Sequence, residues 1–187
     1  MIVMAEVTRL TVRRLTEPDW AALRATRLAA LAEAPYAFSS TLERELGFTE
    51  HTWRSRLGPE AIAAHFGADP PGVSGPAGRH DGEPAPLDGL AALLREPSAE
   101  APVSWQLVSM WVSPQARGQG LADRLVAAVC DLARAGGSAE IGLWVTLANE
   151  RARAFYRRAG FAGTGERQLV RPQEPDHWEE RMVRPLG

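Results

Sequence analysis

Apolar and polar positions along the chain predict strands and helices in alternation. The stretch Gln106–Val112 is apolar on both faces, which is typical of a strand buried inside a sheet. From Leu121 to Leu132 apolar residues recur every three or four positions, which predicts an amphipathic helix. A short glycine turn separates the two, and Gly136–Gly137 predicts the end of the helix. The chain between residues 106 and 137 therefore predicts a strand, a tight turn and a helix in direct succession.

The same pattern predicts further strands and helices on both sides of this segment. One helix separates the strand ending at Val112 from the strand containing Ile141, so these two strands should be parallel and joined by a right-handed crossover. Strands are predicted at Val7–Leu15, Ala61–Phe66, Leu90–Arg95, Val103–Val112, Glu140–Thr146, Glu166–Val170 and Trp178–Val183. Helices are predicted at Pro18–Ala34, at Thr49–Leu57, between Asn149 and Gly160, and from a capping box at Ser40–Glu43 to Gly47.

One stretch carries no apolar periodicity. Between Gly67 and Gly89, 11 of the 23 residues are Gly or Pro. Such a composition is typical of a long surface loop or insertion that packs no core of its own. We therefore expect Gly67–Gly89 to be a mobile loop within one domain that spans residues 1–187, and a shorter turn at Pro97–Pro102. Whether the long loop covers a binding site stays open.

Composition and charge narrow the functional classes. With 187 residues, 45% hydrophobic and 24% charged, the chain has the make-up of an ordinary globular domain. The net charge of −2 gives no basic field for nucleic acid. We expect no membrane partner and no signal peptide, because no apolar run is long enough. A single cysteine, Cys130, excludes a disulfide framework, so a cytoplasmic protein is expected.

The turn between the central strand and the following helix predicts an anion site. Arg117–Gly120 leads into a helix N-terminus, whose free backbone N–H groups and dipole, equivalent to roughly half a positive charge, favour a phosphate. A dinucleotide loop would need a third glycine where Asp123 stands. A Walker loop would need a lysine, and all 21 basic residues are arginine. The phosphate therefore belongs to another class of ligand.

Two segments resemble the coenzyme A-binding motifs of the GCN5-related N-acetyltransferase (GNAT) family. Arg117–Ala122 matches its Gln/Arg-x-x-Gly-x-Gly/Ala loop between a strand and a helix. Asn149–Phe161 matches its Asn-x-x-Ala-x-x-Phe-Tyr-x-x-x-Gly-Phe segment at every named position. A glycine turn or a capped amphipathic helix can arise without such a function, but both occur here in the order and spacing of the family. The resemblance is strong between residues 106 and 161 and loose elsewhere.

The resemblance implies a fold, a coenzyme and roles for named residues. The fold would be one α/β domain, a mixed and largely antiparallel sheet flanked by helices with a central parallel strand pair, and acetyl-CoA would be the co-substrate. Asn149 would hydrogen-bond the pantetheine arm, and Tyr156 would be the general acid for the leaving thiolate. Tyr36 and Phe38 would line the acceptor site. The residues along the thioester would be Met110, Trp111 and Val112, and the backbone around the pyrophosphate would be that of Arg117, Gly118, Gln119, Gly120, Leu121 and Ala122.

The general base stays open. Many relatives carry a glutamate in the central strand near the position of Gln106, and a glutamine cannot accept a proton. Glu33, Glu43 and His65 are the substitutes. An α-amine is already ~10% neutral at pH 7 and a lysine amine only ~0.04%, so a missing base favours an acceptor of low pKa. The four histidines show no metal-ligand spacing, so no metal is expected. The tryptophans expected in the core, and not as ligand platforms, are Trp53, Trp111, Trp144 and Trp178.

These features predict an acetyl-CoA-dependent N-acetyltransferase that moves the acetyl group directly to a primary amine. A small-molecule acceptor is preferred, because the charge pattern gives no clear sign of a peptide groove. Two alternatives stay open. One is a catalytically silent acyl-CoA-binding or sensing domain, which Gln106 would suit, and the other is a protein N-terminal acetyltransferase. Monomer and homodimer both stay open.

Overall fold

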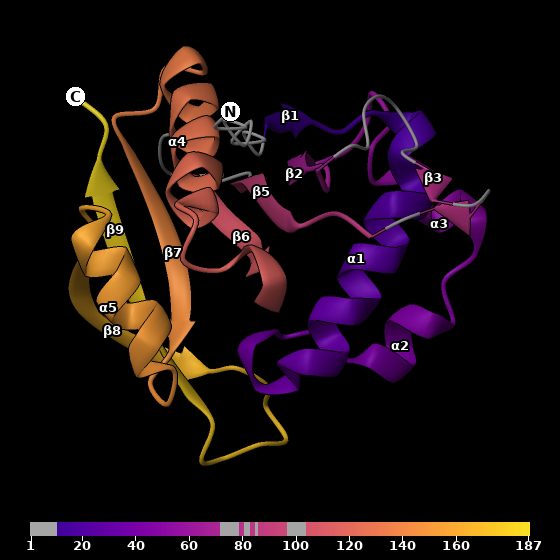
Figure 1. Cartoon of the computed structure of the whole chain (residues 1–187). Helices are drawn as coiled ribbons and strands as arrows, with labels where there is room; N and C mark the ends of the chain where they lie inside the picture. Colours follow the sequence, from indigo (N-terminus) through magenta and orange to yellow (C-terminus); the bar gives the residue numbers. More distant parts are fainter. Residues whose placement is uncertain (1–10, 72–78, 81–82, 85, 97–103) are drawn as a thin grey trace, which may run out of the picture.

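A seven-stranded sheet with helices on both sides forms the body of the protein (Figure 1). The structure is a computed structural model that describes residues 11–71, 79–80, 83–84, 86–96 and 104–187. The strands are β1 (Val12–Arg14), β2 (Ala63–Ala68), β3 (Arg79–His80), β4 (Glu83–Pro84), β5 (Gly89–Glu96), β6 (Ser104–Val112), β7 (Glu140–Thr146), β8 (Ala162–Leu169) and β9 (Trp178–Pro185). The helices are α1 (Trp20–Glu33), α2 (Leu42–Leu46), α3 (Glu50–Ser55), α4 (Leu121–Ala135) and α5 (Glu150–Arg158), with the 3-10 turns η1 (Glu17–Asp19), η2 (Pro35–Ala37) and η3 (Pro114–Ala116).

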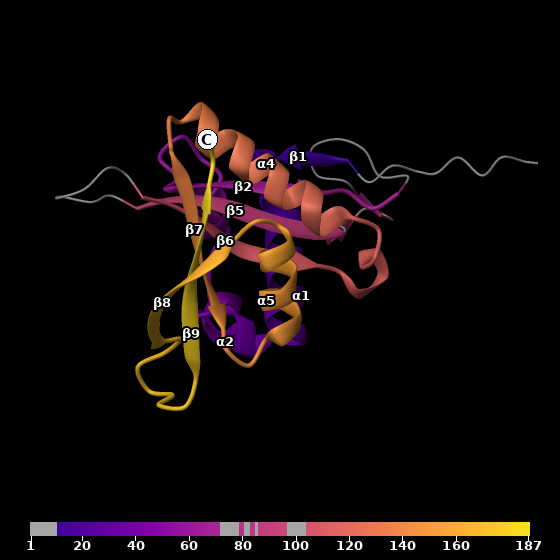
Figure 2. The same cartoon turned by 90° about the vertical axis from the view of Figure 1, so that its left-hand side faces the viewer.

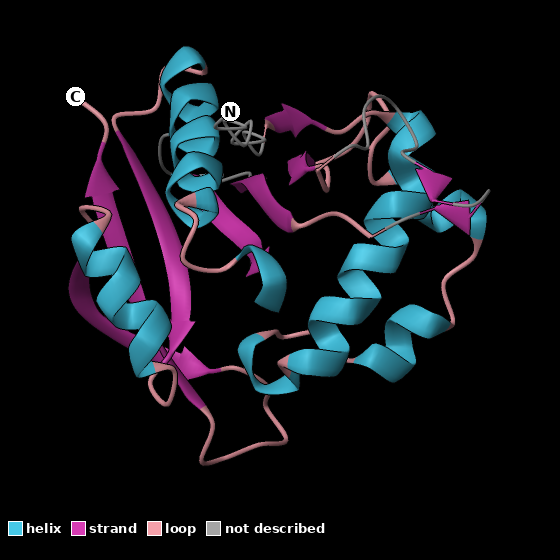
Figure 3. Cartoon of the chain, in the orientation of Figure 1, coloured by secondary structure: helices cyan, strands magenta, loops and turns pink. Residues whose placement is uncertain are grey.

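The large sheet is antiparallel except at its centre. Its order is β1-β2-β5-β6-β7-β9-β8, and β3 pairs with β4 in a separate sheet. Strands β6 and β7 run in parallel, and their register contains one residue pair, Gln106 with Gly142. Beyond that pair β6 follows β5 and β7 follows β9, so the two strands separate toward their C-terminal ends (Figure 3). The predicted fold class and the predicted parallel connection through α4 are confirmed.

Helices α4 and α5 cover one face of this sheet. Leu125 and Val129 of α4 are fully buried, in agreement with the helical spacing of apolar residues. They share one core cluster with Tyr156 of α5 and Met182 of β9. Gly137, with φ of 80°, ends α4 in the left-handed conformation that glycine adopts without cost. The crossover helix is therefore held firmly over the central strands.

Helices α1 and α3 pack on the other face. Leu23 of α1 and Trp53 of α3 are buried with Leu87 and Leu90 in a second core cluster. Figure 1 shows α1 on the side of the molecule that holds β1, β2 and β5, and α5 on the side that holds β7, β8 and β9. In Figure 2, which looks from the left-hand side of Figure 1, α5 lies in front of α1. The gap between β6 and β7 thus lies between two halves of the molecule, each with its own helices.

The structure moves the limits of the predicted loop Gly67–Gly89. Gly67 and Ala68 complete β2, and Gly89 begins β5, because both ends of the stretch pair in the sheet. Leu87 is buried, so this part of the stretch contributes to the core. Residues 72–78, 81–82 and 85 of the predicted loop lie outside the described residues. The same holds for residues 7–10 of the first predicted strand and for the predicted turn Pro97–Pro102.

Two local predictions are wrong. The N-cap of α2 is Thr41, whose hydroxyl accepts a hydrogen bond from the backbone N–H of Arg44, and the capping box predicted from Ser40 does not form. Trp178, predicted to lie in the core, is 42% exposed. It pairs with Leu169 of β8, an edge strand that is exposed over nearly its whole length, so Trp178 stays partly exposed as well. Trp53 is fully buried, as predicted.

Candidate active site

The loop before α4 has a backbone that requires glycine. Gly118 and Gly120 have φ values of 78° and 72°, which L side chains rarely adopt. A Cβ atom at either position would meet no other atom within 4 Å, so the loop is open on its outer side. Gly120 is also the N-cap of α4, and it offers no side-chain cap to the first backbone N–H groups. Free donors and free space together are what an anion needs.

Short contacts fix this loop to the end of the central strand. Ser113 Oγ donates to Asp88 Oδ1 at 2.9 Å and accepts from the N–H of Ala116 at 3.3 Å. Arg117 Nε donates to the carbonyl of Val112 at 3.1 Å. The N-terminus of α4 is therefore held at the C-terminal end of β6, beside the gap that opens between β6 and β7.

Glu33, the last residue of α1, joins the glycine loop to the central strand. Both of its carboxylate oxygens lie 2.7 Å from Arg117 Nη2, and Trp111 Nε1 donates to Oε2 at 2.7 Å. The hydrogen bond from Arg117 lowers the pKa of Glu33 most strongly. Partial burial raises this pKa, and the hydrogen bond from Trp111 lowers it again, so that it lies below its ordinary value. A carboxylate that is bound three times and made more acidic is a weak general base, which argues against Glu33 in that role.

A β-bulge in β6 lies at the start of the residues expected along the thioester. The register between β5 and β6 shifts between Leu90 and Ala92, where β6 carries one extra residue. Ser109 in this bulge has φ of 56°, unusual for a residue other than glycine. Met110 belongs to the bulge with Ser109, and Trp111 and Val112 follow it, beyond the point where β6 has left β7.

Asn149 stands at the N-terminus of helix α5, and Tyr156 lies within the helix. Asn149 is the N-cap, and its Oδ1 accepts from the N–H of Ala152 at 3.0 Å. The ring of Tyr156 is buried, with centroid distances of 5.3 Å to Phe155 and 5.7 Å to Phe161. Burial raises the pKa of Tyr156, so its hydroxyl stays protonated at neutral pH.

The two residues expected in the acceptor wall differ in exposure. Tyr36 in η2 is 50% exposed, whereas Phe38 is buried. The guanidinium of Arg27 stacks over the Phe38 ring at 4.6 Å and binds the buried carboxylate of Glu45 through Nε and Nη2. Phe38 is therefore a packed support of this turn, and Tyr36 is the ring that a ligand can reach.

One arginine from the far end of the chain holds this turn in place. Arg171, between β8 and β9, donates through Nη2 to the carbonyls of Pro35 and Phe38, both at 2.8 Å, and through Nε to that of Ser39 at 3.3 Å. Its Nη1 binds Glu174. No pattern in the sequence indicates this contact, because the partners are backbone oxygens more than 130 positions away.

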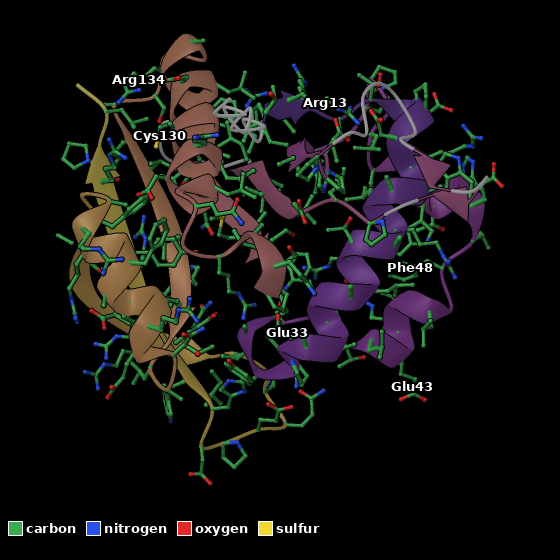
Figure 4. All side chains as sticks on the ribbon, in the orientation of Figure 1. Arg13, Glu33, Glu43, Phe48, Cys130 and Arg134 are labelled. Carbon is green, nitrogen blue, oxygen red and sulfur yellow. The ribbon has the colours of Figure 1, made fainter. Side chains whose placement is uncertain are left out.

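The other substitutes for a general base lie away from the glycine loop. Glu43 is exposed and points out from α2 (Figure 4). His65 is buried in β2, and burial together with the charges of Arg56 and Arg27 lowers its pKa to about 4. His65 borders an open groove of about 1000 Å³, which Trp105 also lines. This groove lies at the start of β6, whereas the glycine loop lies at its end.

The described part of the chain holds neither a metal-binding cluster nor a membrane-spanning helix. Nowhere in it do three or more His, Cys, Asp or Glu side chains come together in a group that could hold a metal ion. None of the described helices is long and apolar enough to cross a membrane.

Solved structures with this fold are numerous. A GNAT-family acetyltransferase from Streptococcus pneumoniae is 19% identical with a TM-score of 0.71, and the match covers 96% of this chain and 100% of that one. YncA from Salmonella typhimurium, solved with acetyl-CoA, is 16% identical with a TM-score of 0.67 and covers 96% and 95%. A chain of the NatC complex bound to Gag peptide and CoA is 16% identical with a TM-score of 0.65 and covers 96% and 99%. At these low sequence identities, the structural matches show a shared fold alone.

Comparison of the sequence itself is more specific. No curated protein sequence matches the chain. The profile of the Acetyltransferase (GNAT) family matches residues 36–161, which include both the glycine loop and helix α5. This match covers well over half of the chain, and the chain therefore belongs to the GNAT family of acetyltransferases and is an acyltransferase.

Proposed function

We propose that the protein transfers the acetyl group of acetyl-CoA directly to a primary amine of a small molecule. The main support is the position of the open glycine loop at the end of β6, beside the gap between two parallel strands. The backbone N–H groups of residues 118–122 would bind the pyrophosphate, as the free donors at a helix N-terminus can. The pantetheine arm would lie along Met110–Val112, with Asn149 on its other side. The YncA structure, which shares the fold, was solved with acetyl-CoA.

The proposed reaction needs an oxyanion donor and a way to release the thiolate. A backbone N–H of β6 after the bulge would polarise the thioester carbonyl. A tyrosine has an ordinary pKa of ~10 and a thiol one of ~8.5, so proton transfer from the tyrosine to the thiolate is uphill by about 2 kcal/mol. Because burial raises the pKa of Tyr156, complete transfer would cost more. We therefore assign to its hydroxyl a hydrogen bond to the leaving sulfur.

The preference for a small acceptor rests on the loops around the gap. Arg171 bonds the loop between β8 and β9 to the turn between α1 and α2. Loops that are tied together leave less room for an extended peptide than separate loops do. A peptide acceptor is the alternative, since the NatC structure with the same fold was solved with a peptide.

The experiment is a free-thiol assay with acetyl-CoA and a panel of primary amines, supported by calorimetry of acetyl-CoA binding. We expect binding, and thiol release that depends on at least one small amine. Release with peptide N-termini alone would make the protein an N-terminal acetyltransferase. Binding without release for any acceptor would support a silent acyl-CoA-binding domain. Absence of binding would overturn the proposal.

A further inference from the structure

Two polar side chains near the C-terminal end of β7 each have one buried atom without a hydrogen-bond partner. Thr146, the last residue of β7, is 3% exposed, and its Oγ1 has no partner in the structure. His177, which precedes β9, binds Glu174 through Nδ1 at 2.7 Å, but its buried Nε2 has no partner. A buried hydroxyl without a partner is costly, so Thr146 points to a missing ligand.

Strand register places a carboxylate beside Thr146. Thr146 of β7 pairs directly with Glu179 of β9. Val145 lies in the core cluster under α4 and α5, and its partner Glu180 binds Arg153 of α5 at 2.9 Å. Because side chains alternate along a strand, Thr146 and Glu179 both point to the opposite face, away from α5.

The same register places this carboxylate near the reacting strand. Gln106 of β6 pairs with Gly142 of the parallel strand β7. Thr146 lies four residues after Gly142, and Met110 lies four residues after Gln106. Thr146 is therefore level with Met110 and Trp111, across the gap between β6 and β7. Glu179 lies one strand further, at a strand spacing of about 4.8 Å. The side chain is half-buried, and Gln168 of β8 donates to its Oε1 at 2.7 Å, which leaves Oε2 for another donor.

The acceptor wall lies on the same side. Arg171 ties the loop that leads into β9 to the turn that carries Tyr36 and Phe38. β7 also contacts η2, so the end of β7, the start of β9 and the turn after α1 come together. An amine that enters between this wall and the thioester would therefore pass Glu179.

We propose that Glu179 binds the acceptor's ammonium group and removes its proton, with Thr146 Oγ1 accepting a second N–H. The proposal rests on the function proposed above. Glu179 takes one proton from the ammonium and later releases it to water. The neutral amine then forms the C–N bond, the C–S bond breaks, and the proton that the nitrogen loses goes to the departing thiolate. The products are the amide, the free thiol of CoA and one proton.

The surroundings of Glu179 suit a base. Burial raises the pKa of Glu179, while the hydrogen bond from Gln168 and the charge of His177 oppose the rise. Two arginines of this region are already paired, Arg181 with Glu166 at 3.0 Å and Arg171 with Glu174. A carboxylate with a raised pKa holds a proton more readily than an ordinary one, as proton removal from an amine requires.

The test compares Glu179→Gln with Glu166→Gln, an exposed glutamate on the neighbouring strand. Thiol release is measured from pH 6 to 10 with glycinamide, tyramine and cadaverine as acceptors, and acetyl-CoA binding by calorimetry. For Glu179→Gln at pH 7 we expect kcat/KM to fall ~10²-fold or more, with acetyl-CoA affinity unchanged. The loss should shrink as rising pH deprotonates the amine, and it should be larger for cadaverine than for glycinamide. Glu166→Gln should follow the wild type.

Two results would overturn the proposal. One is a Glu179→Gln variant with the kcat/KM and the pH profile of the wild type. The other is a loss that is equal at every pH and for every amine, because a purely structural role would produce it. A wild-type protein that releases no thiol with any amine would instead contradict the underlying function.

Discussion

Glu33 and Arg117 form an ion pair in which both carboxylate oxygens lie 2.7 Å from one guanidinium nitrogen, although the two residues are 84 positions apart in the sequence. The pair connects the end of α1 to the loop proposed to hold the coenzyme's pyrophosphate. Its side chains are 36% and 31% exposed, so the pair itself should add only about 0.2–1 kcal/mol to folding stability. Its effect should therefore appear in binding more than in stability.

We predict that Arg117→Ala weakens acetyl-CoA binding by about tenfold, or 1.4 kcal/mol. The change removes the anchor to Val112 and leaves the Glu33 carboxylate unpaired near the phosphate site. Glu33→Gln in the Arg117→Ala background should recover part of the loss, because it removes the unpaired charge. Calorimetry on both single variants and the double variant measures the coupling. Strictly additive effects would contradict this account.

The second prediction concerns charge at Gly120. Gly120→Asp and Gly120→Asn impose the same backbone strain of roughly 1–2 kcal/mol, because φ is 72° and the side chains are alike in size. Only Asp brings a negative charge to the proposed phosphate site. We expect the Asp variant to bind acetyl-CoA at least ~10-fold more weakly than the Asn variant, at equal melting temperature. Gly137→Asn, with φ of 80° at the other end of α4, is the control for strain alone. Equal affinity of the two Gly120 variants for acetyl-CoA would contradict the proposal that the phosphate binds at this loop.

The segment from β6 to α4 could be predicted because its signals are local. A continuous apolar run, a glycine turn and helical spacing act within a few residues, and Gly120 lies where these signals place it. The bulge at Ser109 could not be predicted, because it arises from the pairing of β6 with β5. Serine, unlike glycine, is also not a residue that indicates a positive φ.

The acceptor side could not be predicted because its contacts are distant in sequence. Arg171 meets backbone oxygens of the turn after α1, and Thr146 meets Glu179 only through strand register. Neither contact leaves a spacing pattern in the chain. For the same reason the sequence offered Glu33 as a base, and only the folded chain shows the carboxylate held by Arg117 and Trp111.

The third prediction is acid sensitivity through His65. The pKa of His65 is about 4 in the folded protein, against an ordinary value of 6.5. Between these values the unfolded chain binds a proton that the folded chain excludes, so stability is complete above pH 6.5 and falls as pH drops toward 4. At ~1.4 kcal/mol per pH unit the total loss is roughly 3 kcal/mol.

His65→Leu should remove this sensitivity. Because Nδ1 of His65 has no hydrogen-bond partner, the substitution should cost little at pH 7 and stabilise the protein increasingly toward pH 5. Urea unfolding at several pH values measures the difference, and His51→Leu, an exposed histidine on α3, should keep the pH dependence of the wild type. A constant difference between His65→Leu and wild type at all pH values would contradict the prediction.

The last prediction is the effect of the Tyr156 hydroxyl on turnover. Tyr156→Phe keeps the ring, its contacts with Phe155 and Phe161 and most of its apolar burial, so folding should change little. If the hydroxyl donates to the leaving sulfur, its removal destabilises the thiolate only as the C–S bond breaks. We therefore expect kcat to fall ~10²-fold with acetyl-CoA affinity nearly unchanged. The loss should be greatest for acceptors that attack fast, since thiolate departure then limits the rate. Stopped-flow measurement of thiol release gives kcat, and calorimetry gives the affinity. A Phe variant that turns over its best acceptor at the wild-type rate would leave Tyr156 as a core residue and place catalysis in the positioning of the coenzyme alone.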